Sequence, residues 1–288
     1  MTRETPPDLV TGPTRTDRPS RTTARTMLNK VPEVTLYFWI IKILCTTVGE
    51  TAADYMNDTL GFGLDKTSYV MSAALIIALF FQFRARRYVP GIYWLSVVLI
   101  SVVGTLISDK LADDLGVPLV ITTVLFAVLL AITFAVWYAT ERTLSIHSIV
   151  TGRRETFYWL AILFTFALGT SAGDLFDEKL GVGYWPTVGI VAALIALIAV
   201  AHLGLRLNAV LAFWAAYILT RPLGASIGDG MSQPAKNGGF GLGTTGTSFI
   251  FLAVILALVI FLSVTKVDRT ENQSGDREEL DEPDSVTV

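Results

Sequence analysis

The sequence predicts an all-α polytopic membrane protein with eight transmembrane helices, arranged as four parallel two-helix repeats. Three observations support this fold class. The chain has 288 residues, of which 52% are hydrophobic and only 16% charged, and its mean hydropathy is +0.56, outside the range of an ordinary soluble domain. Several apolar runs approach or exceed the ~20 residues that a helix needs to cross a bilayer. Finally, one pattern of tryptophan, glycine and aspartate recurs four times.

The two ends of the chain differ in composition from the rest. Residues 1–33 are rich in Thr, Arg and Pro without an apolar run, so we expect a disordered cytoplasmic tail and not a signal peptide. Residues 267–288 are acidic and predict a second disordered cytoplasmic tail. The transmembrane domain is therefore expected over 34–266, with repeats at about 36–88, 89–152, 153–206 and 207–266.

Composition and missing motifs exclude several functions. Cys45 is the only cysteine, which argues against disulfides and cysteine metal clusters. The net charge is only −3, so we expect no nucleic-acid partner. There is no Gly-rich nucleotide motif, no zinc-protease motif and no nucleophile elbow. We therefore expect neither an ATP-driven pump nor an enzyme, although paired carboxylates can in principle perform acid–base work.

The internal repeat begins at a tryptophan, has a glycine ten residues later and an aspartate five residues after that. The tryptophans are Trp39, Trp94, Trp159 and Trp214; the glycines are Gly49, Gly104, Gly169 and Gly224; the aspartates are Asp54, Asp109, Asp174 and Asp229. Four residues further on stand Asp58, Asp113, Glu178 and, in the fourth copy, Gln233. We call each copy of this Trp–Gly–Asp pattern a tryptophan frame. Each frame lies at the end of one apolar segment, and a second apolar segment follows it.

The eight apolar segments define the expected helices in order. Their predicted ranges are 36–54, 68–84, 91–109, 118–139, 156–174, 186–205, 209–228 and 247–265. Two helices per unit return the chain to its starting side, so all four copies have the same orientation.

Basic residues in the short loops predict the orientation, because they gather on the cytoplasmic side. The heavier set is Lys30, Arg84, Arg86, Arg87, Arg142, Arg153, Arg154, Arg206, Lys266 and Arg269; the lighter set is Lys66, Lys110, Lys179 and Lys236. We expect a multi-pass protein of the cell inner membrane with both termini cytoplasmic. The aspartates then lie at the extracytoplasmic ends of the odd-numbered helices.

On the four frames quoted above, the chain resembles a family of bacterial membrane proteins made of four tandem two-helix repeats, each marked by a tryptophan and of unknown function. The resemblance covers the chain from Val34 to about Lys266. It implies the fold and the membrane location but no activity. The fourth copy departs from the pattern at Gln233 and in the loop that follows, which puts strict fourfold equivalence in question.

The repeated tryptophans and glycines have structural interpretations. A tryptophan at a helix start is typical of an anchor at the membrane interface, and packing between repeats is the alternative. Each glycine is followed four residues later by Ala53, Ser108, Gly173 or Gly228, and such pairs of small residues let helices approach closely in lipid. We therefore expect the odd-numbered helices to form an inner bundle.

The acids admit two interpretations. Each aspartate lies fifteen residues after its tryptophan, ~22 Å along a helix and so still inside the extracytoplasmic part of the bilayer, where a carboxylate is costly unless it faces water or a counter-charge. The functional hypothesis is an inner ring of Asp54, Asp109, Asp174 and Asp229 as oxygen ligands for a divalent cation. Asp58, Asp113 and Glu178 would form an outer ring. Alternatively, each aspartate only marks the end of its helix.

Two basic residues lie deeper in the membrane than the two predicted rings of acids. Arg221 precedes Pro222 about halfway along the seventh helix, and an intramembrane arginine usually faces the bundle interior and pairs with an acid. We interpret it as the counter-ion of the carboxylate site. Lys42 is expected to extend to the cytoplasmic face, and His147 and His202 to be ordinary residues in or beside loops.

The leading functional hypothesis is a secondary transporter or permease for a small cation, with a divalent metal favoured, intramembrane carboxylates as the site and proton exchange as a possible driving force. No resident cofactor is expected, and the lipid bilayer and the cation are the expected partners. The alternative is a non-transporting membrane scaffold or sensor.

Overall fold

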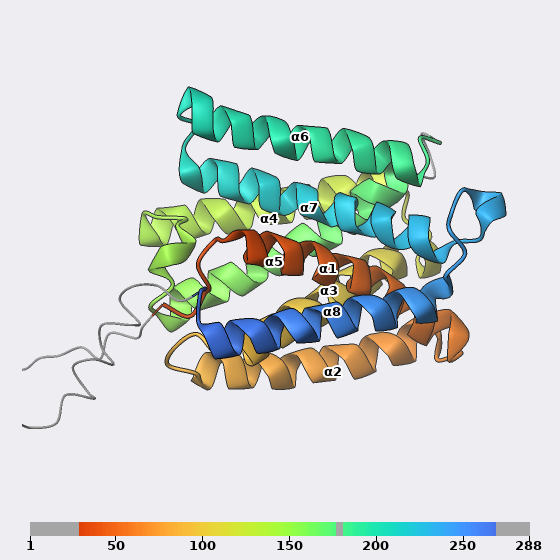
Figure 1. Cartoon of the computed structure of the whole chain (residues 1–288), viewed down its shortest axis with the longest axis horizontal. Helices are drawn as coiled ribbons and strands as arrows, with labels where there is room; N and C mark the ends of the chain where they lie inside the picture. Colours follow the sequence, from red (N-terminus) through yellow and green to blue (C-terminus); the bar gives the residue numbers. More distant parts are fainter. Residues whose placement is uncertain (1–28, 177–180, 269–288) are drawn as a thin grey trace, which may run out of the picture.

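The computed structural model describes residues 29–176 and 181–268, which form eight long helices and no strand. All eight are long and apolar enough to cross a membrane (Figure 1). They are α1 (Leu36–Asp54), α2 (Gly63–Arg84), α3 (Pro90–Asp109), α4 (Leu119–Glu141), α5 (Gly152–Asp174), α6 (Tyr184–Leu205), α7 (Ala209–Ser232) and α8 (Gly243–Thr265). Short helical turns η1 (Tyr55–Thr59), η2 (Lys110–Asp114), η3 (Ile146–Ser148) and η5 (Ala235–Asn237) lie between them. The predicted fold class is confirmed.

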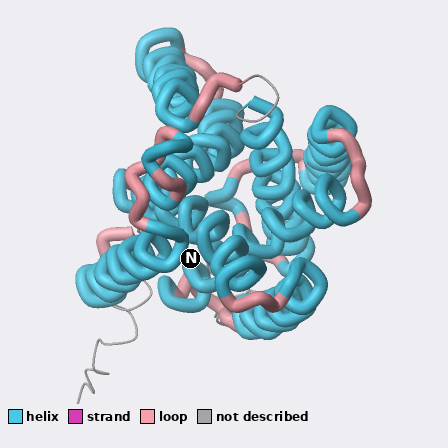
Figure 2. Tube along the Cα trace, turned by 90° about the vertical axis from the view of Figure 1, so that its right-hand side faces the viewer, coloured by secondary structure: helices cyan, strands magenta, loops and turns pink. Residues whose placement is uncertain are grey.

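The odd-numbered helices form a closed inner bundle. Contacts run from α1 to α3, from α3 to α5, from α5 to α7 and from α7 back to α1. The even-numbered helices lie outside (Figure 2). Each packs mainly on the first helix of the next repeat, α2 on α3, α4 on α5 and α6 on α7, while α8 closes the circle on α1. The repeat in the sequence is therefore not the packing unit, since the second helix of each repeat packs mainly on the following repeat and not on its own.

The four repeated glycines explain why the inner helices come so close. A Cβ atom on Gly49 would overlap Ser101, one on Gly104 would overlap Phe166, one on Gly169 would overlap Arg221, and one on Gly224 would overlap Thr46. Each overlapping residue stands three positions before the glycine of its own repeat. One contact is thus repeated four times around the bundle, at the positions where the sequence predicts close helix packing.

The tryptophans form a second cyclic contact near the other end of the inner helices. Trp94, Trp159 and Trp214 are buried, with 1%, 3% and 4% of their surface exposed. The ring pairs are Phe38–Trp94 at 5.6 Å, Tyr93–Trp159 at 5.5 Å, Tyr158–Trp214 at 6.3 Å and, closing the circle, Phe213–Trp39 at 5.7 Å. The interpretation as interface anchors is wrong for the three buried rings, because each packs on an aromatic residue of the preceding repeat instead of facing headgroups.

The described ends of the chain are packed against the bundle, unlike the tails expected at 1–33 and 267–288. Lys30 is buried and its Nζ lies 2.7 Å from Glu155 Oε2. Asp268 is buried and accepts a 2.6 Å hydrogen bond from Tyr88. Both segments lie at the same end of the bundle (Figure 1). The folded domain therefore extends at least from Lys30 to Asp268.

The glycine packing predicts a specific sensitivity to a single methyl group. Gly104→Ala should lower the free energy of unfolding by about 1–3 kcal/mol, because overfilling a packed interface displaces the neighbouring helix. Thermal unfolding in detergent measures the loss. The matched control is Gly189→Ala in α6, where no atom lies within 4 Å of the added Cβ. Equal melting temperatures for the two variants would contradict the packing role.

Candidate functional site

A cavity of about 650 Å³ opens at the end of the bundle where α1, α3 and α5 finish. Of the twelve described residues that line it, five are acidic and none is basic. The acids are Glu50, Asp54, Asp109, Asp113 and Asp174. Three members of the predicted inner ring are therefore brought together, and we call this space the acidic cavity.

A change of helix type places these aspartates at the cavity wall. The α-helix ends at Asp54 in the first repeat and at Asp109 in the second, and a turn of π-helix follows at once. Such turns are rare and concentrate at functional sites. In the second repeat both acids, Asp109 and Asp113, line the cavity. Asp113 is exposed at the cavity rim.

The remaining members of the predicted outer ring are not placed. The structure describes the backbone but not the side chain of Asp58, and Glu178 lies outside the described residues. The outer ring therefore stays a prediction.

The fourth repeat differs, as its sequence suggested. Here α7 continues as an α-helix to Ser232, and Asp229 is not among the residues that line the acidic cavity. The following loop folds back onto the helix end, where Phe240 N donates to Gly230 O at 2.8 Å. The ring of Trp185 also packs there, against Gly230. The four-aspartate inner ring is therefore wrong in its fourth member, because a longer loop covers that helix end.

Arg221 lies behind the cavity wall, in contact with the lining residue Glu50. Its Nη2 donates to Glu50 Oε2 at 2.6 Å and also to the hydroxyls of Thr105 and Thr170. These three partners each directly follow the repeat glycine of α1, α3 and α5. One arginine from the fourth repeat is thus held by equivalent positions of the other three. Arg221 was expected to pair with a carboxylate, and the structure identifies that carboxylate as Glu50.

The ion pair is buried and only partly satisfied. Arg221 has none of its surface exposed. Its Nε and Nη1 have no hydrogen-bond partner among the described residues. Unpartnered buried donors are uncommon and call for an explanation such as a bound water or ion. Removing one member of a buried ion pair typically costs about 3–5 kcal/mol, because the other charge is left uncompensated.

The opposite end of the bundle also contains buried polar side chains. Glu155 accepts from Lys30 at 2.7 Å and from Gln82 at 3.2 Å, and all three are buried. Beside them, burial and the neighbouring carboxylate of Asp268 raise the pKa of Tyr88 well above its usual value. Tyr88 therefore stays a neutral hydrogen-bond donor. These buried polar contacts lie at the opposite end of the bundle from the acidic cavity.

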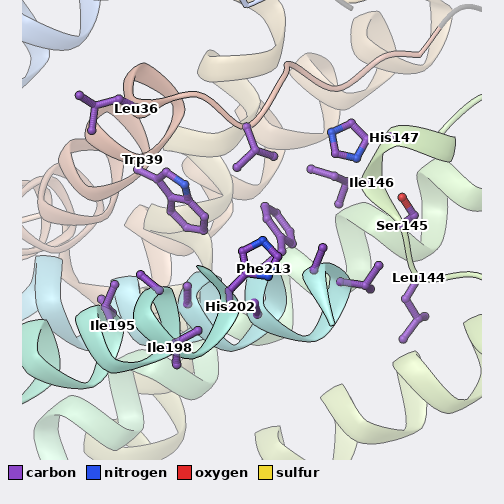
Figure 3. A pocket seen from close by; sticks show the side chains of 16 residues that line it. Leu36, Trp39, Leu144, Ser145, Ile146, His147, Ile195, Ile198, His202 and Phe213 are labelled. Carbon is purple, nitrogen blue, oxygen red and sulfur yellow. The ribbon is translucent and has the colours of Figure 1, made fainter. Parts of the chain in front are cut away.

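The two histidines lie at a second cavity of about 620 Å³ (Figure 3). His147 belongs to η3, whereas His202 lies in the last turn of α6 with its Nδ1 2.8 Å from Leu207 O. His147 therefore lies in a loop and His202 beside one, as expected from the sequence. The other lining residues are almost all hydrocarbon, such as Ile195, Ile198 and Phe213. A charged cargo would find few polar partners there, so this cavity is not the candidate site.

The expected metal site needs correction. Among residues 29–176 and 181–268, no group of three or more His, Cys, Asp or Glu side chains is placed so that it could hold a metal ion. The four aspartates Asp54, Asp109, Asp174 and Asp229 therefore do not form a direct ligand set in this part of the chain. The carboxylates that line the cavity instead surround a space wide enough for water.

Two buried residues near Arg221 were not predicted correctly from the sequence. Glu50 stands where the other repeats have Thr105, Thr170 and Ala225, so a comparison position by position would have revealed an acid at the level of Arg221. Lys42 was expected at the membrane surface, but only 1% of it is exposed and its Nζ donates to Thr46. Its position in the first repeat corresponds to Val97, Ile162 and Tyr217, which marks it as a core position.

The fold and the acidic cavity together define a multi-pass membrane protein with pseudo-fourfold repeats and a polar site inside its helical bundle. The model of the family described as "Repeat of Unknown Function (DUF347)" matches residues 37–88, 92–143, 157–207 and 212–268. The chain belongs to this family, as its tryptophan frames indicated. Neither the curated proteins nor the solved structures contain a match.

The ion pair can be tested by a double-mutant cycle. Glu50→Gln and Arg221→Gln should each lower the free energy of unfolding by about 3–5 kcal/mol, since each leaves one buried charge unpaired. The double variant should lose clearly less than the sum of the two, because no unpaired charge remains. Thermal unfolding in detergent provides the values. Strictly additive losses would show that the two side chains do not interact.

Proposed function

We propose that this protein is a secondary transporter or permease for a small cation, located in the cell inner membrane with both termini cytoplasmic. A divalent metal ion is the favoured cargo. The observation that carries the proposal is the acidic cavity, whose lining residue Glu50 is paired with the buried Arg221. Five lining carboxylates and no lining basic residue give the space a strongly negative potential, which concentrates cations.

The size of the cavity favours a cation that keeps its water. At roughly 30 Å³ per molecule, a space of about 650 Å³ has room for ~20 waters. Mg²⁺ in particular gives up its water reluctantly and is often held by only one or two carboxylates. Carboxylates that do not converge on one point therefore suit a hydrated ion.

The contact between Glu50 and Arg221 supplies a means of coupling. Glu50 both lines the cavity and holds Arg221, so a cation that reaches Glu50 competes with the guanidinium for the same oxygens. Pro222 follows Arg221 directly inside α7, and it cannot donate to the carbonyl four residues earlier. The helix is thereby weakened where the arginine would move. Alternating access to the opposite end of the bundle requires a displacement of this kind.

Transport should depend on the carboxylates of the acidic cavity. In liposomes that contain the purified protein, Mn²⁺ uptake should fall at least tenfold in Asp109→Asn/Asp174→Asn and in Glu50→Gln, because each substitution removes negative charge from the entry path. An entrapped metal-sensitive dye follows the uptake, and Mg²⁺ and Ca²⁺ serve as parallel substrates.

The matched control is Asp65→Asn, which removes an exposed acid outside the cavity lining and should leave uptake unchanged. If no cation enters faster than in protein-free liposomes, the proposal fails. If the cavity variants transport like the wild type, the carboxylates are not the site, and a scaffold or sensor role is favoured.

A further inference from the structure

Lys42 is a second buried cation beneath the acidic cavity. Its Nζ donates to Thr46 Oγ1 at 3.1 Å. The same nitrogen lies 4.2 Å from the ring centre of Phe166 and 4.4 Å from that of Tyr217. Two aromatic faces and one hydroxyl thus surround an ammonium group that has no carboxylate in salt-bridge range among the described residues.

The charges around Lys42 do not balance. Arg221 from α7 is the neighbouring charge, and its guanidinium carbon lies 5.8 Å from the centre of the same Phe166 ring. The two cationic centres are therefore within about 10 Å of each other. The other titratable groups facing Lys42 are Cys45 on its own helix and Tyr217 on α7. Both are neutral in their ordinary protonated forms. Among the described residues Glu50 forms a salt bridge with Arg221, while Lys42 forms none.

Of the two cations, only Lys42 can give up its charge. A guanidinium stays protonated in proteins, whereas a buried lysine loses its proton readily. As long as Glu50 neutralises Arg221, the layer tolerates the charged ammonium between its two rings. A metal cation that binds to Glu50 brings further positive charge to this layer. The least costly response is loss of the proton of Lys42.

We propose that Lys42 is the proton-exchange site of this protein, releasing one proton for each cation that binds to Glu50 in the acidic cavity. This inference rests on the proposed function. In the exchange, one N–H bond of the ammonium breaks, the nitrogen keeps the electron pair, and the proton passes to water. When the cation leaves, the neutral amine takes up a proton again. Cation movement in one direction is then coupled to proton movement in the other.

The test measures proton release and cation binding separately on the full-length protein in detergent. Mn²⁺ binding is followed by the electron-spin resonance of the free ion, and proton release by a pH dye in weakly buffered solution. The wild type should release about one proton per bound Mn²⁺ more than Lys42→Met or Lys42→Arg. The first variant is permanently neutral and the second permanently charged, so Mn²⁺ should bind more tightly to Lys42→Met and more weakly to Lys42→Arg.

Lys236→Met is the matched control, since Lys236 is exposed in η5, and it should behave like the wild type. Carboxylates of the cavity also release protons on binding, and comparison with Lys42→Met subtracts their contribution. Equal proton release from the wild type and both variants, with Mn²⁺ still bound, overturns the role of Lys42 but leaves the cation site intact. If Mn²⁺ does not bind the wild type, both proposals fail. Should neither variant fold, a wild-type Mn²⁺ affinity that does not change with pH still overturns the inference.

Discussion

The buried contact between Arg221 and Glu50 is the constraint on which the central layers depend. A guanidinium at this depth is tolerated only with a counter-charge and hydrogen-bond acceptors. Glu50 supplies the charge, and Thr105 and Thr170 supply hydroxyls from two further helices. The stem of the arginine needs room as well, and Gly169 provides it, because a Cβ there would overlap the Cβ and Cγ of Arg221. Four inner helices thus meet at one side chain.

Around this contact, the bundle is closed like a ring of four subunits joined head to tail. Each repeat presents a glycine to one neighbour and the residue three positions earlier to the other. Such an interface is heterologous, and it closes only if the rotation per unit completes a circle. Closure is completed by Gly224 against Thr46 and by α8 against α1. Because second helices pack on the following repeat, a repeat removed from the chain would leave two faces uncovered.

The sequence determined the architecture more reliably than the site, for physical reasons. Apolar length and the tryptophan frames were sufficient for eight helices and four repeats, since a bilayer permits few alternatives. The depth of Trp94 and Lys42 was misjudged, because a residue near a helix end can face either headgroups or a neighbouring helix. Glu50 was overlooked since it lies outside the repeated frame, although its partner Arg221 was recognised. Asp229 was grouped with the other three because the sequence does not show how its loop folds back over the helix end.

The departure from fourfold symmetry is what would make the proposed response to a cation physically possible. If all four repeats carried an arginine at the position of Arg221, the layer would hold four equal charges, which a dry interior does not tolerate. If none did, the layer would hold no charge that could respond to a cation. In the proposed transport cycle, a single arginine held by one carboxylate instead allows two states, in which Glu50 binds either the guanidinium or an incoming cation. A ligand shifts an equilibrium only by its differential affinity for the two states. Glu50 provides that difference, because it belongs both to the wall of the acidic cavity and to the ion pair below it.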